Sequence, residues 1–309
     1  MKQSRREFLI QGSTAVAAAG FLIGGVRTAC ANPLGRPIGL QLYTVMEQLG
    51  KDFDGTLTQI FGIGYREVEM AGFFGKKPAE IKQSLDNAGL HCASVHIFPP
   101  GGAEEALEYA AVIGAKYVIS SAIPPEHASV NVHPGKFNAN AFVAALNSLT
   151  LDDYRSIAEQ CNRLGEKAKQ AGLQFGYHNH NFEFRPFTGG IGYDELLRST
   201  DPELVKLELD CGWMVIAGHD PVAYIRKFPG RYRLLHIKDF KPTTKPSFDL
   251  DRRPESAPLG RGHIDYKPIF AAAKQSSVEW YYVEQEPPYK ELSAMETIKV
   301  NYEYLHAMD

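Results

Sequence analysis

Hydrophobic and polar positions alternate between two patterns along most of the chain, from about residue 36 to residue 308. Short runs rich in β-branched and aromatic residues predict strands, and apolar residues spaced by three and four predict helices. Gly89, Gly114 and Gly172 each follow a helical run and favour its termination there. The predicted strands are 38–43, 65–70, 91–97, 116–121, 173–178, 204–210, 232–238 and 278–284. The predicted helices are 53–62, 78–88, 104–113, 152–171, 193–199, one after Asp220-Pro221, 265–275 and 290–306.

Strands that are separated by helices indicate a parallel sheet. Eight such units favour an α/β fold closed into a single (β/α)8 barrel over residues 36–308, because open doubly wound sheets usually have fewer strands. Residues 122–150 are expected to form a loop, and a loop of that length is typical of a functional segment such as a lid. A second polar, Pro-rich loop is expected at 240–262. Neither G-x-G-x-x-G nor a P-loop motif occurs, so nucleotide binding through either is unsupported.

The first 31 residues have the pattern of a targeting segment. Ser4-Arg5-Arg6-Glu7-Phe8-Leu9-Ile10 resembles a twin-arginine signal, an apolar stretch over about 14–26 follows, and Ala29-Cys30-Ala31 offers a cleavage site. We therefore expect residues 1–31 to be a signal peptide and the mature protein to be exported to the periplasm. A membrane anchor is the alternative, but the apolar stretch is short and Gly-rich for a spanning helix. Lipidation of Cys30 is disfavoured because Arg27 stands where a lipobox has an aliphatic residue.

Charge and cysteine content narrow the class of protein. The chain of 309 residues has a net charge of -3, which becomes more negative when the signal is removed. A nucleic-acid partner would call for a basic stripe, so none is expected. Cys92, Cys161 and Cys211 remain after cleavage, and their number and spacing match neither a disulfide scaffold nor a zinc motif. Cys92 and Cys161 are expected to be core thiols.

Polar residues stand at the carboxyl ends of six predicted strands, where a barrel of this kind carries its active site. A lone histidine is usually a satisfied core residue, but six converging titratable groups are hard to explain by packing, because each unpaired one is costly to desolvate. Four of them come from consecutive strands and mix imidazole with carboxylate, which suits one divalent Mn, Co, Fe or Zn ion. The alternative is a hydrogen-bonded cluster without metal. The six are Glu69, His96, His178, Asp210, His236 and Glu284, of which the last four form the predicted metal set.

Five motifs together resemble the xylose isomerase-like barrel superfamily, which includes sugar isomerases, ketose epimerases and inosose dehydratase. They are Tyr177-His-Asn-His-Asn-Phe-Glu-Phe184, Leu207-Glu-Leu-Asp-Cys-Gly-Trp213, Leu235-His-Ile-Lys-Asp239, Gly260-Arg-Gly-His-Ile-Asp265 and Tyr282-Val-Glu-Gln-Glu286. The resemblance implies metal ligands at Asp210, His236 and Glu284. It expects a glutamate on the fifth strand, where this chain has His178, with His180 two residues further on. Either histidine could be the ligand, and His178 is favoured.

The same substitution affects the expected catalytic pair. Epimerases of the superfamily pass a proton between two glutamates, whereas here Glu284 would work with His178 or with Glu183. Substrate contacts are expected from His180, His96, Glu69, Lys238, Trp213 and Arg261. Phe182, Phe73 and Tyr43 are candidates to line the site together with Trp213.

The resemblance implies a metal-stabilised enediolate of an unphosphorylated sugar or keto-sugar, since phosphosugars are scarce outside the cytoplasm. Isomerisation or epimerisation is the first reading. Elimination from keto-sugars or keto-glycosides by a dehydratase or lyase is the second, and a non-catalytic sugar-binding barrel is the third. The sugar, the metal and the oligomeric state are not fixed by the sequence, and self-association stays open.

Overall fold

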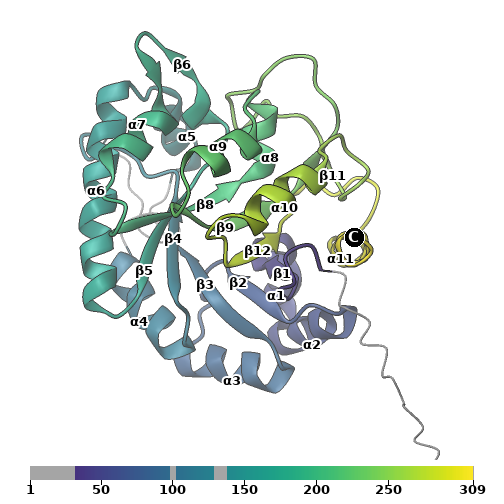
Figure 1. Cartoon of the computed structure of the whole chain (residues 1–309). Coiled ribbons are helices and arrows are strands. Elements are labelled where there is room, and N and C mark those ends of the chain that lie inside the picture. The colour runs from purple at the N-terminus through teal and green to yellow at the C-terminus, as the bar shows by residue number, and fades with distance from the viewer. Residues whose placement is uncertain (1–31, 98–101, 129–137, 309) are drawn as a thin grey trace, which may run out of the picture. The chain divides into compact units, whose positions relative to one another are not determined.

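A closed barrel of eight parallel strands organises the part of the chain that the structure describes (Figure 1). The computed structural model describes residues 32–97, 102–128 and 138–308. Around the barrel the strand order is β1-β12-β9-β8-β5-β4-β3-β2, which confirms the predicted (β/α)8 fold. The barrel strands are β1 (Gly39–Gln41), β2 (Glu67–Met70), β3 (His91–Ile97), β4 (Tyr117–Ser121), β5 (Gln174–His178), β8 (Val205–Asp210), β9 (Tyr232–Ile237) and β12 (Trp280–Val283).

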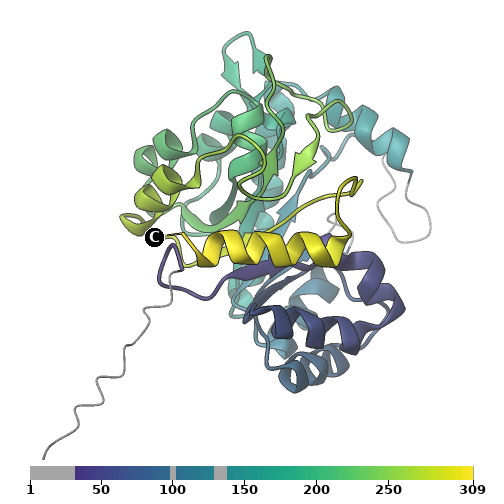
Figure 2. The same ribbon diagram turned by 90° about the vertical axis from the view of Figure 1, so that its right-hand side faces the viewer.

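Helices pack around the outside of these strands (Figures 1 and 2). They are α1 (Met46–Lys51), α2 (Phe53–Ile63), α3 (Pro78–Ala88), α4 (Ala103–Ile113), α5 (Ala139–Asn147), α6 (Leu151–Gln170), α7 (Gly192–Ser199), α8 (Cys211–Ile216), α9 (Pro221–Lys227), α10 (Tyr266–Lys274) and α11 (Ala294–His306). Short 3-10 turns follow β1 and β5, namely η1 (Leu42–Val45) and η3 (Phe182–Phe184). Two small antiparallel pairs also occur among the described residues, β6 (Pro186–Phe187) with β7 (Gly190–Ile191), and β10 (Asp239–Phe240) with β11 (Ser256–Ala257).

Local sequence explains where the longer helices begin and end. Thr150 and Asp153 form a reciprocal capping box at the start of α6, and Ser293 and Glu296 form another at the start of α11. Helix α3 starts with Pro78 in its first turn and ends at Gly89, whose φ of 73° is left-handed. These caps fix the lengths of the helices and therefore the height at which each following strand starts.

The barrel interior has two layers of different chemistry. Because Leu234 and Tyr282 stand two residues before His236 and Glu284, they point into the barrel on the amino-end side of the polar groups. With neighbouring side chains they form a small apolar cluster of Tyr117, Ile119, Leu234 and Tyr282. Gly176 makes room for this layer, since a Cβ there would lie 2.5 Å from the Ile119 side chain. The polar groups of the upper layer therefore stand on an apolar floor.

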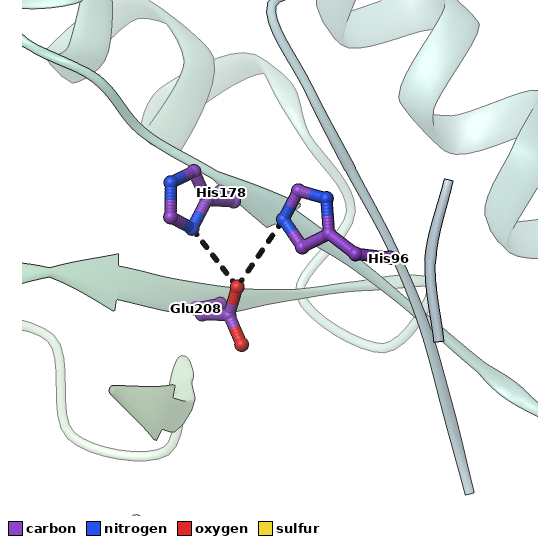
Figure 3. A group of neighbouring side chains, drawn as sticks. All are labelled: His96, His178 and Glu208. Carbon is purple, nitrogen blue, oxygen red and sulfur yellow. Dashed lines mark hydrogen bonds and ion pairs between the residues drawn. The ribbon is translucent and has the colours of Figure 1, made fainter. Parts of the chain in front are cut away.

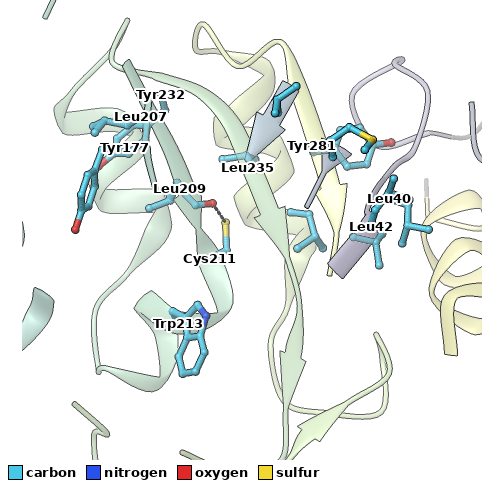
Figure 4. Packing of buried hydrophobic residues seen from close by; sticks show 14 of the residues in the cluster. Leu40, Leu42, Tyr177, Leu207, Leu209, Cys211, Trp213, Tyr232, Leu235 and Tyr281 are labelled. Carbon is cyan, nitrogen blue, oxygen red and sulfur yellow. Dashed lines mark hydrogen bonds between the residues drawn. The ribbon is translucent and has the colours of Figure 1, made fainter. Parts of the chain in front are cut away.

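The main hydrophobic core lies between the strands and the surrounding helices. Figure 4 shows part of it, where Leu207 and Leu209 of β8 lie near Tyr177 of β5 and Cys211 of α8. Cys92, Cys161 and Cys211 are buried free thiols, which confirms the two predicted core cysteines. Burial raises the pKa of all three thiols, so they are neutral packing groups.

The structure corrects several sequence expectations. Residues 122–150 are not one loop, because α5 occupies Ala139–Asn147 with Asn138 as its N-cap. Helix α8 follows Asp210 directly and was not predicted. The last helix begins at Ala294, four residues later than expected, since Ser293 caps it. In the described ranges no helix is both long and apolar enough to cross a membrane. The predicted signal peptide, residues 1–31, lies outside the described residues.

Candidate active site

Three side chains from three strands meet at the carboxyl end of the barrel. Glu208 of β8 lies between His178 of β5 and His96 of β3 (Figure 3). Its Oε2 atom is 2.9 Å from His178 Nδ1 and 3.5 Å from His96 Nε2. Sequence reasoning missed Glu208, although a signal was present: it stands two residues before Asp210, and alternation along a strand puts both on one face.

His236 of β9 lies at the centre of a ring of carboxylates. Its Nε2 atom is 2.7 Å from Glu69 and 3.1 Å from Glu208, and its Nδ1 atom is 3.2 Å from Glu284. Burial lowers the pKa of His236, but the charges of Glu208 and Glu69 more than offset burial and raise it well above the usual range. Glu69 and Glu208 are fully buried, so His236 is one of the cations that makes their charges tolerable.

The predicted metal ligands are brought together. His178 Nε2 and His236 Nδ1 lie 3.8 Å and 3.9 Å from Asp210 Oδ2, and one ligand atom from each of the three residues lies within 4.8 Å of the others. Glu284 joins the group through its contact with His236. Asp210 divides its two oxygens between tasks: Oδ1 accepts a hydrogen bond from Trp213 N and caps α8, whereas Oδ2 faces the two imidazoles and lies 2.9 Å from the Lys238 ammonium.

These residues fit a divalent cation. Two imidazole nitrogens and two carboxylate oxygens suit Zn or another first-row transition metal, and Asp210 Oδ2 accepts no well-directed hydrogen bond, although the Lys238 ammonium lies 2.9 Å away. His178 has the orientation that a ligand needs, because its other nitrogen contacts a carboxylate, Glu208. Glu208 also belongs to two further candidate groups, with His96 and His178 and with Glu69 and His236.

Lys238 supplies a second buried cation beside this set. Its ammonium lies 2.9 Å from Asp210 Oδ2, 2.5 Å from Glu284 Oε2 and 2.8 Å from Glu286 Oε1, and 5.1 Å from the centre of the Trp213 ring. Burial lowers the pKa of Lys238, but the three carboxylates more than offset burial and raise it, so the side chain stays charged. Glu286 was not predicted, although it stands two residues after Glu284.

The two candidates on the turn after β5 differ from His178 in their surroundings. Both Glu183 oxygens are occupied, since Oε1 accepts from Tyr177 OH at 2.9 Å and Oε2 from His180 N at 2.9 Å. Burial raises the pKa of Glu183 to about 8. These contacts give Glu183 a role in holding the turn, and its catalytic role stays a prediction. His180 stacks on Phe182 at 5.8 Å, and burial lowers its pKa to about 3, so it is neutral.

The remaining residues that were predicted to contact substrate differ in their distance from the metal set. Trp213 is buried beside the cluster, 5.5 Å from His180. Tyr43 is 42% exposed but lies near the site, since burial and the charges of Glu286 and Glu284 raise its pKa. Phe73 stacks instead on Tyr109. Arg261 is exposed, and its guanidinium reaches Glu291 at 3.9 Å rather than any residue of the cluster described above.

The arginine that does reach the site is Arg253, which sequence reasoning missed. Its Nη1 atom is 2.6 Å from Glu286, and its guanidinium lies 5.2 Å from the Trp213 ring centre. It comes from the loop between β10 and β11, where no periodic pattern marks one residue from the next.

Comparison with known proteins agrees with this geometry. The family model described as "Xylose isomerase-like TIM barrel" matches residues 59–304. An inosose dehydratase of Lacticaseibacillus casei is 28% identical over 262 residues, covering 78% of this chain and 85% of the relative. One from Geobacillus kaustophilus is 27% identical over 256 residues, covering 75% and 80%.

Solved structures give the same result. A sugar phosphate isomerase/epimerase of Parabacteroides distasonis is 25% identical with a TM-score of 0.67, covering 86% of this chain and 96% of that one. The chain therefore belongs to the xylose isomerase-like TIM barrel family, a family of enzymes. Its relatives in this family include both dehydratases and isomerase/epimerases. The chain is therefore an enzyme of the sugar isomerase, epimerase and dehydratase group.

Proposed function

We propose that the protein is a metal-dependent dehydratase or lyase of an unphosphorylated keto-sugar or keto-glycoside. One observation carries the proposal: the Glu284 carboxylate and the Lys238 ammonium are paired at 2.5 Å, beside the imidazole and carboxylate groups of His178, Asp210 and His236. A base and a fixed cation on the same side of a site are what an elimination needs. The dehydratase names of the curated relatives support the same choice.

The metal would be held by the four ligands predicted from the sequence, which are His178, Asp210, His236 and Glu284. A divalent ion bound there would polarise the keto oxygen of the substrate and make the adjacent C–H bond more acidic. Mn, Co, Fe and Zn all accept such mixed donors. A more distant structural relative, 14% identical with a TM-score of 0.60, was solved with a bound zinc atom.

Glu284 takes the proton from the carbon next to the keto group and returns it to the departing oxygen. The C–H and C–O bonds break, a C=C bond forms, and the departing oxygen gains the proton, so an enone and water result. With a glycosidic oxygen the leaving molecule is an alcohol instead. Lys238 keeps its charge and donates a hydrogen bond to the departing oxygen, which stabilises the negative charge that develops on it.

Epimerisation or isomerisation, the first reading of the sequence, is the second candidate, and the Parabacteroides distasonis relative favours it. Epimerisation needs a second base on the opposite face of the sugar. His178 is a weak candidate for that base, because Nδ1 contacts Glu208 and Nε2 faces Asp210. Glu183 has both oxygens engaged. Glu284 pairs with Lys238 and His236 through Oε2 alone and leaves Oε1 outside these pairs, so one carboxylate base rather than two opposed bases is at hand, which supports elimination better.

The test follows the fate of one proton. The full chain is loaded with Mn, Co or Zn and incubated in D2O with an inosose or a methyl keto-glucoside, and products are followed by NMR and mass spectrometry. A dehydratase or lyase releases water or methanol and forms an enone. An epimerase or isomerase instead gives a deuterated sugar without such loss, which would refute elimination. Glu284→Gln should abolish either reaction. If no probe is turned over, both enzymatic proposals fail and the non-catalytic sugar-binding barrel is the reading that remains.

Export is proposed on sequence alone. The Arg5-Arg6 pair and the apolar stretch after it support twin-arginine targeting to the periplasm. Replacement of both arginines by lysine should retain the protein in the cytoplasm, as measured by cell fractionation and immunoblotting. Unchanged periplasmic recovery of that variant would refute the proposal.

A further inference from the structure

A cleft of about 860 Å³ lies beside the candidate active site, between the turn after β5 and the loop that joins β10 to β11. The loop and the β6–β7 hairpin lie on the same side of the barrel (Figures 1 and 2). Single binding sites for small molecules usually measure about 300–1,000 Å³, so the cleft alone has the size of a whole site. No residue of the metal set lines it.

The walls of the cleft are held by hydrogen bonds. Asn181 donates from Nδ2 to Ser247 Oγ at 3.3 Å and to Asp249 O at 3.1 Å, which ties the loop to the turn after β5. Arg185 donates to Asn147 O at 2.6 Å and to Phe248 O at 3.3 Å. The cleft is therefore a built feature, framed by the end of α5, the turn after β5 and the loop.

Positive charge predominates on the lining. Five basic side chains line the cleft against two acidic ones, and the basic ones are Arg185, Lys241, Lys245, Arg252 and Arg253. Arg252 is paired with Asp249 at 2.8 Å. The Lys245 ammonium is exposed and has no ion-pair partner in the part of the chain that the structure describes. The free cation favours an anionic ligand.

Arg253 connects the cleft to the active site. It lines the cleft, and it also contacts Glu286 at 2.6 Å and lies over Trp213. Glu286 in turn contacts Lys238 at 2.8 Å. Arg253 therefore borders both the cleft and the carboxylate that pairs with Lys238.

We infer that the cleft is a second subsite, which binds the part of the substrate that is not transformed, and that this part is a sugar or aglycone carrying a carboxylate. The inference rests on the proposed function and deepens it, since it makes the substrate a glycoside or oligosaccharide rather than a free monosaccharide. The transformed ring lies against Glu284 and Lys238. The attached group lies in the cleft, where Arg253 and Lys245 face its negative charge.

The test compares three probes by titration calorimetry with the full chain: glucose, cellobiose and cellobiuronic acid, which carries one carboxylate. Cellobiuronic acid should bind more tightly than cellobiose, and cellobiose more tightly than glucose. An exposed ion pair is worth up to about fivefold in affinity, so Lys245→Glu should remove about that factor for cellobiuronic acid and leave cellobiose unchanged. Added salt should weaken the acidic probe selectively.

Lys274→Glu is the matched control, because Lys274 is an exposed lysine in the last turn of α10, next to the amino end of β12. It changes the net charge equally and should leave all three affinities unchanged. Equal affinity for glucose and both disaccharides would overturn the subsite. Equal effects of Lys245→Glu and Lys274→Glu would overturn its anionic ligand.

The two proposals fail separately. Elimination from a keto-monosaccharide, with no effect of Lys245→Glu on cellobiuronic acid, would sink the subsite and leave the proposed function. Charge-dependent binding of cellobiuronic acid without turnover of any keto-sugar would refute the proposed function and leave the anionic subsite. Lys274→Glu should keep the turnover of a small keto-sugar, because Lys274 lines neither the cleft nor the metal set.

Discussion

Replacing His236 by alanine should destabilise the metal-free protein strongly. The His236 ring contacts Glu69, Glu208 and Glu284 at 2.7 to 3.2 Å, and the first two carboxylates are fully buried. Its removal leaves Glu69 and Glu208 facing each other without the cation between them. Breaking a buried ion pair from one side typically costs about 3–5 kcal/mol. At about 2 °C per kcal/mol for a chain of this size, the melting temperature should fall by about 6–10 °C.

His91→Ala is the matched control for that experiment. His91 also contacts a buried glutamate, Glu67, at 2.5 Å, but the His91 side chain is 60% exposed. Water can replace it, so the expected loss is about 0–1 kcal/mol. Urea unfolding of the chelator-treated full chain, followed by the fluorescence of Trp213 and Trp280, measures both variants. A loss for His236→Ala no larger than for His91→Ala would refute the electrostatic argument, whatever the metal does.

Three further predictions follow from other contacts. Lys238→Met should tighten binding of Mn or Zn by about tenfold or more in titration calorimetry, because a cation 2.5–2.9 Å from two ligand carboxylates repels a dication; weaker binding would contradict this. Burial raises the pKa of Glu183 in the folded state to about 8. Between about pH 4.5 and 8 the folded state therefore keeps a proton that the unfolded state has lost. The free energy of unfolding falls as pH rises through that range. Relative to wild type, Glu183→Gln should therefore gain about 1 kcal/mol or more in urea unfolding between pH 5 and pH 8, and an unchanged difference would argue against the raised pKa. Gly176→Ala should lower the free energy of unfolding by about 1–3 kcal/mol in the same assay, because the new Cβ would lie 2.5 Å from Ile119. Gly62→Ala is the control on the exposed side of α2, where a Cβ meets nothing, and it should cause no loss.

Alternation and strand ends made much of the site predictable. Residues at the carboxyl ends of parallel strands must share one mouth, so His178, Asp210, His236 and Glu284 could be grouped before any coordinates. The same rule would have found Glu208, which stands two residues before Asp210 on the same face of β8, and Glu286 stands at the same spacing after Glu284, just beyond the end of β12. They were missed because only one residue was taken from each strand end.

Other features depend on contacts that the sequence pattern does not encode. Helix α8 has six residues and follows β8 without a loop, so its periodicity is too short to separate from the strand. Arg253 reaches the site because the β10–β11 loop folds back over Trp213, and nothing local distinguishes it from Arg261. Whether Lys238 faces substrate or carboxylates depends on Glu286, which comes from the segment after β12.

The apolar floor of Tyr117, Ile119, Leu234 and Tyr282 closes the barrel interior below the polar groups, which in the described part of the chain leaves the carboxyl ends of the strands as the way in. Substrate, product and any released water or alcohol must all pass the same mouth, and nothing can drain through the amino end of the strands. A product that is still bound then blocks the next substrate. Inhibition by product should accordingly be competitive with substrate, and the order of release should govern turnover as much as the chemistry does.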